Sequence, residues 1–181
     1  FSFVNAHGFV KYKGKKYNLR GKGSMEHILT NYSFGKIANR WQITRAFTEG
    51  KNFVLYGYQN KRGKSIRTFI VRDRHGRMLD SGKITKVLAK KYLKAKIGNG
   101  TLLEKGKMLF HKKCWLTTSY TWNGSLSLLQ GLPIWLRVFV RAFFANPHRY
   151  QLQASVQYYC QKNNRKIYDT FLGKQVYYKI K

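Results

Sequence analysis

Apolar and polar residues alternate with a period of two over long parts of the chain, which predicts β-strands. The clearest run is residues 148–161, where Tyr150, Leu152, Ala154, Val156, Tyr158 and Cys160 fall on one face and four glutamines and a serine on the other. Shorter runs at 41–48, 53–59, 65–72 and 77–80 are separated by turns that contain glycine. These runs predict an antiparallel meander of three or four strands, with Trp41, Ile43 and Phe47 on the apolar face of its first strand.

Residues 9–20 predict a β-hairpin around Lys13-Gly14-Lys15, because two short aromatic-bearing runs flank a turn sequence. Short strands are also predicted between residues 101 and 122 and after residue 165. The chain is therefore expected to be dominated by antiparallel sheet.

A helical period, about 100° per residue, is found in residues 81–97. It collects Ile84, Val87, Leu88, Tyr92 and Ala95 on one face, and Lys83, Lys86, Lys90 and Lys94 on the opposite face. Ser81 suits the N-cap, and Gly98 follows the last periodic residue. The pattern predicts a helix with a lysine face and no acidic residue to balance it.

Two further helices are predicted. Ser24 precedes the periodic stretch 25–32, and Pro133 opens an apolar stretch, 133–145, that ends before Asn146-Pro147. Arg137 and Arg141 disfavour a lone transmembrane helix in this region, because arginine near the bilayer centre is costly. The stretch is expected to be a core helix, with a helix lying in a membrane interface as the alternative.

These elements predict an α+β fold, dominated by antiparallel sheet, with two β-rich units and two or three flanking helices. The first unit is residues 1–100, with the hairpin, a helix, the meander and the basic helix. The second is residues 101–181, with the apolar helix 133–145. The two units are also compatible with one continuous domain.

Charge narrows the expected partners. Thirty-six Lys and Arg against six Asp and Glu give a net charge of +30, while the 43% hydrophobic content predicts a folded chain. A polyanion would relieve the self-repulsion at this charge. Nucleic acid, RNA or DNA, is the expected partner, bound through its phosphate backbone with help from aromatic stacking. The predicted binding residues are Lys83, Lys86, Lys90, Lys94, Lys61, Arg62, Lys64, Arg67 and Tyr58.

Catalytic chemistry has weaker support, and we expect neither an enzyme nor a bound cofactor. The six acidic residues are scattered without the spacing of a two-metal site. A metal-free ribonuclease that uses histidines is an alternative. A metal site from His111, Cys114, His148 and Cys160 lacks the paired spacing of zinc ligands. Cys114 and Cys160 are expected to be free buried thiols.

Two other interpretations stay open at this stage. In the first, the protein is a structural subunit of a large nucleoprotein particle and assembles with other proteins. In the second, it binds an anionic membrane surface through helix 133–145. The residues FSFVNAHGFV lack the basic start and long apolar core of a signal peptide. The sequence does not decide between DNA and RNA or fix a compartment.

Overall fold

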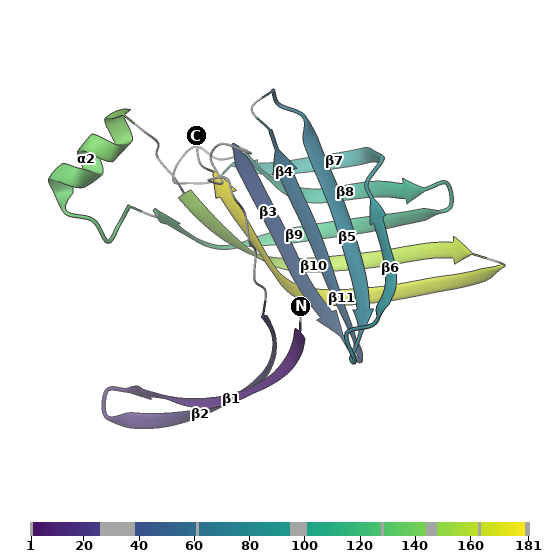
Figure 1. Cartoon of the computed structure of the whole chain (residues 1–181), viewed down its shortest axis with the longest axis horizontal. Coiled ribbons are helices and arrows are strands. Elements are labelled where there is room, and N and C mark those ends of the chain that lie inside the picture. The colour runs from purple at the N-terminus through teal and green to yellow at the C-terminus, as the bar shows by residue number, and fades with distance from the viewer. Residues whose placement is uncertain are drawn as a thin grey trace.

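The computed structural model describes residues 2–25, 39–60, 62–94, 101–127, 129–143, 148–162 and 164–179, and these form a nearly all-β structure (Figure 1). The strands are β1 (Ser2–Tyr12), β2 (Lys15–Met25), β3 (Arg40–Thr48), β4 (Lys51–Gln59), β5 (Ser65–Asp73), β6 (Met78–Lys83), β7 (Lys86–Lys94), β8 (Thr101–His111), β9 (Cys114–Ser127), β10 (His148–Lys162) and β11 (Arg165–Lys179). In the described part of the chain the one helix is α2 (Ile134–Phe143). The predicted α+β class with two or three helices is therefore wrong.

Nine strands form one antiparallel sheet in the order β6-β5-β4-β3-β11-β10-β9-β8-β7. The sheet curls into a half-barrel, so that β3–β6 cross over β8–β11 (Figure 1). Strands from both predicted ranges, 1–100 and 101–181, contribute to this sheet. The division into two units stays a prediction.

The two edges of the sheet are consecutive in sequence. At the junction of β6 and β7, the amide of Ile84 donates to Arg67 O on β5 at 2.9 Å, and the amide of Thr85 donates to Leu109 O on β8 at 2.8 Å. The chain thus leaves one edge of the sheet and joins the other within two residues. This crossing closes the barrel at one end, and β5 and β7 diverge beyond it.

Gly173 marks the place where β11 turns against β3. A Cβ on this residue would lie 2.0 Å from the carbonyl oxygen of Arg45 and 2.6 Å from the Cα of Ala46. No side chain fits against a backbone at that distance. A glycine within a strand permits such a tight bend, and here it allows the sheet to coil between its two halves.

The core changes character along the barrel. Near the closed end it is apolar, with Phe53, Leu55, Phe69, Leu116 and Phe171 fully buried. A second cluster fills the open half and includes Tyr120, Tyr150 and Tyr177. Tyrosines are therefore more frequent in the core toward the open end.

The predicted lysine-faced helix at 81–97 is wrong, because Met78–Lys83 and Lys86–Lys94 form the strands β6 and β7. Thr85, Val87 and Tyr92 favour a strand. Two register irregularities in β7, between Val87 and Ala89 and between Lys91 and Tyr92, break its alternation. Both strands are edges, and exposed lysines are a common means of protecting an edge from pairing with another chain. The lysines thus lie on the two edge strands and not on one helical face.

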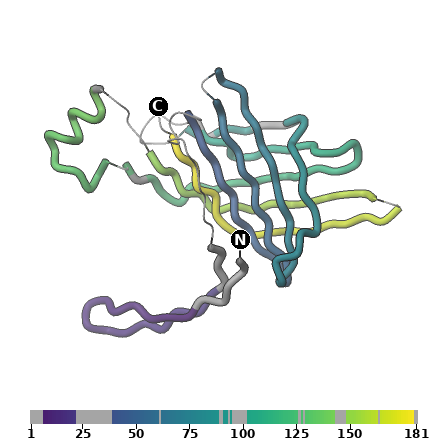
Figure 2. Tube along the Cα trace, in the orientation of Figure 1, coloured from purple at the N-terminus to yellow at the C-terminus, as the bar shows by residue number. Residues whose placement is uncertain are grey.

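Several other predictions are confirmed. The hairpin at 9–20 lies within β1 and β2, where Lys13 and Gly14 both have positive φ, and Figure 2 shows this hairpin extending away from the barrel. The meander is β3 to β6, and the alternation in β10 has the predicted buried face. The helix expected at 133–145 is present as α2, but the expectation that it is a core helix is wrong, because Ile134 and Trp135 are largely exposed. The helix expected at 25–32 lies outside the described residues except for Met25, which ends β2.

Cys114 and Cys160 form a disulfide between neighbouring strands β9 and β10, with a Cα–Cα distance of 4.1 Å. The expectation of free thiols is therefore wrong. Directly opposite residues of an antiparallel pair come this close, and only the register between the strands makes the two cysteines partners. The bond removes both sulfurs from the metal site considered above.

Candidate functional site

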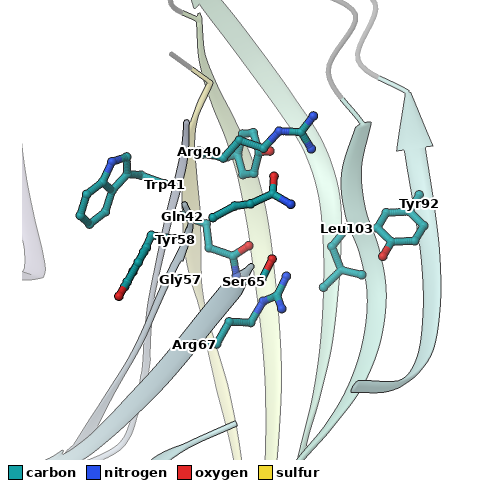
Figure 3. Close-up of a pocket in the computed structure, with 11 residues that line it drawn as sticks. Arg40, Trp41, Gln42, Gly57, Tyr58, Ser65, Arg67, Tyr92 and Leu103 are labelled. Atoms are coloured by element: carbon teal, nitrogen blue, oxygen red, sulfur yellow. The ribbon is translucent and has the colours of Figure 1, made fainter. Parts of the chain in front are cut away.

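A cavity of about 140 Å³ lies at the open end of the barrel, where β5 and β7 diverge. One wall comes from the ends of β3, β4 and β5, and the opposite wall from β7 and β8 (Figure 3). Tyr177 of β11 also lines the cavity. An apolar cavity of about 150 Å³ is known to hold a benzene molecule, so this space accommodates one ring or one small charged group.

The polar wall contains two donors that lack partners. Gln42 of β3 is almost fully buried, and its Nε2 has no hydrogen-bond partner. The Nε of Arg67 on β5 is likewise buried without a partner. Figure 3 shows both side chains, with Ser65, on the cavity side of the strands. Unsatisfied buried donors are costly, and an acceptor bound in the cavity would remove that cost.

Gly57 of β4 makes room for Gln42. A Cβ at Gly57 would lie 2.7 Å from the Cγ of Gln42, so the glutamine side chain lies directly on the glycine. The pairing of β3 with β4 places the two residues opposite each other. A glycine at this point thus sets the position of the amide in the cavity.

Two arginines make the cavity electropositive. Arg40 and Arg67 both line it, and no acidic residue is found among the described residues of its lining. Burial raises the pKa of the Tyr177 phenol. The charge of Arg40, the hydrogen bond between Arg40 and this phenol, and the charge of Arg67 oppose that rise. Tyr177 is therefore neutral at physiological pH and leaves the arginine charges uncompensated. The cavity is suited to an anion.

Behind the cavity, the interior continues as a hydroxyl cluster. Tyr120 is fully buried, and its phenol lies 3.1 Å from the hydroxyl of Thr44. Burial raises the pKa of Tyr120, and its hydrogen bonds with Thr44 and Thr118 and the charge of Arg67 oppose the rise. The buried hydroxyls of Thr44 and Tyr120 thus extend the polar character of the interior inward from Gln42 on the same face of β3.

The opposite wall is aromatic and apolar. Leu103 of β8 faces the gap, with Tyr92 of β7 beside it (Figure 3). Trp41 and Tyr58 point to the other side of β3 and β4, with ring centroids 5.5 Å apart. A flat group between Leu103 and the polar wall would contact hydrocarbon on one side and donors on the other.

The predicted binding residues divide between this cavity and the sheet edges. Arg62 and Lys64 are exposed in the turn between β4 and β5, next to the cavity residues Gln59 and Ser65. Gln59 Nε2 donates to Gly63 O at 2.9 Å, which fixes this turn at the rim. Arg67 points into the cavity rather than outward. Tyr58 lies on the outer face, and Lys61 is outside the described residues.

The lysines of the predicted helix lie elsewhere. Lys83 is exposed at the end of β6, and Lys86 and Lys94 are exposed on β7. Lys90 also belongs to β7, in a part where only the backbone is described. The structure therefore spreads these four residues along the two edge strands and does not gather them in one helical row.

Sequence reasoning missed Arg40, Gln42 and Tyr92. The alternation in β3 placed Trp41, Ile43 and Phe47 on the buried side, whereas Gln42, Thr44 and Ala46 face the interior. Hydrophobicity suggested the wrong face because this end of the interior is polar. The sequence did contain a signal for this face, because the small or polar residues Gln42, Thr44 and Ala46 alternate regularly with bulkier residues along the strand.

The alternative chemical sites gain no support. No group of three His, Cys, Asp or Glu residues gathers in a metal-binding arrangement among the described residues. His7, His75, His111 and His148 lie on separate parts of the fold, and His27 falls outside the described ranges. Within those ranges, no helix has the length and hydrophobicity needed to cross a bilayer.

Comparisons with known proteins show similarity of fold alone. No family model and no curated protein matches the chain in sequence. One similar structure is the crystal structure of a "putative AttH" from Nitrosomonas europaea, with 10% sequence identity and a TM-score of 0.59. The match covers 97% of this chain and 50% of the AttH chain. A second is the crystal structure of kievitone hydratase from Nectria haematococca, with 11% sequence identity and a TM-score of 0.51. The match covers 94% of this chain and 49% of the hydratase chain.

The chain thus spans about half the length of both structures. By its name, kievitone hydratase is an enzyme, so this fold occurs in a protein with catalytic activity. The expectation that the present chain is not an enzyme stays a prediction.

Proposed function

We propose that this protein binds a small organic anion with a planar, partly apolar body in the cavity between β5 and β7. The observation that carries the proposal is the pair of buried donors without partners, Gln42 Nε2 and Arg67 Nε, in a cavity whose described lining contains a second arginine and no carboxylate. A carboxylate or sulfonate would accept from these groups. Hydrogen bonds with a charged partner contribute more than neutral ones.

The volume limits the ligand. A space of about 140 Å³ holds one ring with its charged substituent, and the rest of a larger ligand would extend through the open end past Arg62 and Lys64. Leu103 and Tyr92 supply the surface against which a ring would pack. Aromatic carboxylates are the simplest compounds that combine these features.

The test is a titration with benzoate and, as a neutral analogue, benzyl alcohol, monitored by calorimetry and by the NMR signal of the Gln42 side-chain amide. Benzoate is expected to bind and to shift that signal, whereas benzyl alcohol binds at least tenfold more weakly. Arg67→Gln is expected to reduce benzoate affinity by about 10- to 100-fold, since it removes a charge-assisted bond of about 1.5–3 kcal/mol.

Arg74→Gln is the matched control, because Arg74 is exposed in the β5–β6 turn and does not line the cavity. It removes the same charge and should leave benzoate affinity unchanged. Equal loss in both variants would indicate non-specific attraction to a basic protein and would reject the cavity as the site.

Nucleic-acid binding is the second candidate, favoured by the distribution of charge. Asp73, Asp80, Glu104 and Asp169 each form an ion pair with a lysine or arginine. Even with all six acids paired, thirty positive charges would lack a carboxylate partner. The exposed Lys83, Lys86 and Lys94 on the edge strands, with Arg62 and Lys64, are the residues proposed to contact phosphates.

Binding of single-stranded RNA, single-stranded DNA and duplex DNA across a salt series tests this second candidate. A steep fall of affinity with salt supports backbone binding, and membership of a nucleoprotein particle would be an extension of it. Because the cavity does not include the edge-strand lysines, Arg67→Gln is expected to leave nucleic-acid affinity nearly unchanged.

A further inference from the structure

Helix α2 presents an apolar face to solvent. Ile134 and Trp135 are 77% and 71% exposed, and Val138 and Phe139 are also exposed. Figures 1 and 2 show the helix standing away from the barrel, on the connection between β9 and β10. Contiguous exposed groups of large apolar residues are uncommon in soluble proteins and mark sites of interaction.

The helix is amphipathic, with its apolar side turned outward. At about 100° per residue, Ile134, Val138, Trp135 and Phe139 span one continuous face. Leu136 and Val140 lie on the opposite side and are partly buried. This side of the helix is therefore less exposed than the face that carries Ile134, Trp135 and Val138.

The two arginines of α2 differ in role. The guanidinium of Arg137 donates to Gln130 O at 2.9 Å and to Leu132 O at 3.0 Å, so it fixes the turn that precedes the helix. Arg141 is exposed and lies at one border of the apolar face. Of these two arginines, Arg141 is the one available to an external anion.

Charge complementarity indicates what covers this face. The sequence contains no acidic residue between Glu104 and Asp169, so α2 lies within a long stretch of purely basic charge. A second copy of a chain with a net charge of +30 would repel the first. A surface that is negative and also accepts Trp and Phe at its boundary is an anionic lipid bilayer.

We propose that α2 docks flat on an anionic membrane surface. Ile134, Trp135, Val138 and Phe139 enter the boundary between headgroups and acyl chains, and Arg141 contacts lipid phosphates. The helix has ten residues and lies on the membrane without spanning it. The proposal is independent of the ligand in the cavity.

The experiment is co-sedimentation of the full chain with phosphatidylcholine vesicles, with and without phosphatidylglycerol. The protein is expected to sediment with vesicles that contain phosphatidylglycerol, and its tryptophan emission to shift to the blue. Trp135→Ser with Val138→Ser should lower the partition coefficient by about tenfold or more, because two boundary residues are removed. Arg141→Gln should lower it by about fivefold, the effect of about 1 kcal/mol for one charge at the surface.

Two variants separate docking from simple adsorption of a basic protein. Leu172→Ser alters an exposed leucine on β11 and should leave vesicle binding unchanged. Trp135→Phe keeps an aromatic residue and should retain binding while losing most of the blue shift. Far-UV circular dichroism and thermal unfolding should be the same in every α2 variant, because α2 stands away from the barrel.

Three results would overturn the proposal. One is equal binding to vesicles with and without phosphatidylglycerol. Another is wild-type vesicle binding by the Trp135→Ser, Val138→Ser double variant, since adsorption would then depend on net charge alone. The third is a dimer in light scattering that the double variant abolishes, which would assign the face to a second copy of the chain.

Discussion

The phenol of Tyr158 on β10 donates a hydrogen bond of 2.5 Å to Asp80 Oδ2 on β6. Four strands lie between β6 and β10 in the sheet order, so this bond joins two distant parts of the sheet across the barrel interior. Asp80 Oδ1 also accepts from Lys162 Nζ at 2.9 Å. The short edge strand β6 is thereby held in place by side-chain hydrogen bonds as well as by its backbone pairing with β5.

Removing the Tyr158 hydroxyl should destabilise the closed end of the barrel. We expect Tyr158→Phe to lower the free energy of unfolding by about 1.5–3 kcal/mol, because the charged, partly buried carboxylate of Asp80 loses a hydrogen-bond donor. Urea denaturation measures the change. Tyr159→Phe, on the next residue and the opposite face, is the control and should change stability by less than about 0.5 kcal/mol. Equal effects of the two variants would contradict the role given to the Tyr158–Asp80 bond.

Alkaline pH should weaken the fold through the same residue. Burial raises the pKa of Tyr158 above its usual value of 10.0, and the hydrogen bond to Asp80 and the charges of Asp80 and Asp169 add to the rise. Above pH 10 the unfolded chain releases the phenol proton while the folded chain retains it. The unfolded state then binds fewer protons, so stability falls as pH rises.

Measurement of the free energy of unfolding from pH 9 to pH 11 tests this linkage. Tyr158→Phe should show a smaller loss over that interval than the wild-type protein, although it is less stable at neutral pH. Comparing slopes between variants removes the shared titration of the lysines. Parallel slopes would show that the Tyr158 phenol is not protected in the folded state.

Gly173 should not tolerate a side chain. Gly173→Ala places a methyl group against the backbone of Arg45 and Ala46, which moves only with the strand itself. We expect a loss of about 3 kcal/mol or more in the free energy of unfolding. Gly124→Ala on β9 is the control, because nothing lies within 4 Å of its added Cβ. Similar stability in the two variants would mean that β3 and β11 do not approach each other this closely.

Gly57 should control the cavity. Gly57→Ala would displace the Gln42 side chain, and we expect benzoate affinity to fall several-fold, with a stability loss of about 1 kcal/mol. The double variant Gly57→Ala with Gln42→Ala should recover stability, because the crowded atoms are gone, but not affinity. Recovery of both by the double variant would show that the Gln42 amide does not bind the ligand.

The edge-strand lysines should determine the salt dependence of nucleic-acid binding. Replacing Lys83, Lys86, Lys90 and Lys94 by glutamine should weaken binding and flatten the plot of log affinity against log salt. The slope is expected to change by about 0.7–0.9 for each phosphate that the variant no longer neutralises. Fluorescence anisotropy measures both quantities. An unchanged slope would exclude these strands from the interface.

The sequence determined the local structure where one signal dominated. The alternation in β10 predicted its buried face because that strand packs against apolar neighbours along most of its length. Pro133 directly precedes α2, and Lys13-Gly14 identified the first hairpin. In each case residues close in sequence supply the physical cause, either a fixed φ, a positive φ or a repeating apolar face.

Tertiary structure decided the rest. Residues 81–94 satisfy a helical period and a strand preference at once, and pairing with β5 and β8 selected the strand. Likewise, Gln42 faces the interior because the curl of the sheet leaves a polar gap at the open end. The disulfide depends on the register that places Cys114 opposite Cys160.

By itself, the sequence established a folded, strongly basic, mainly antiparallel β protein, because charge and alternation are properties of neighbouring residues and of totals. It did not establish the half-barrel or the cavity. Those depend on the junction at Ile84 and Thr85, where the chain passes from one edge of the sheet to the other, and on the close approach at Gly173. Contacts between residues far apart in the chain leave no periodic signal, so only the tertiary structure brings Arg40, Arg67 and Gln42 together.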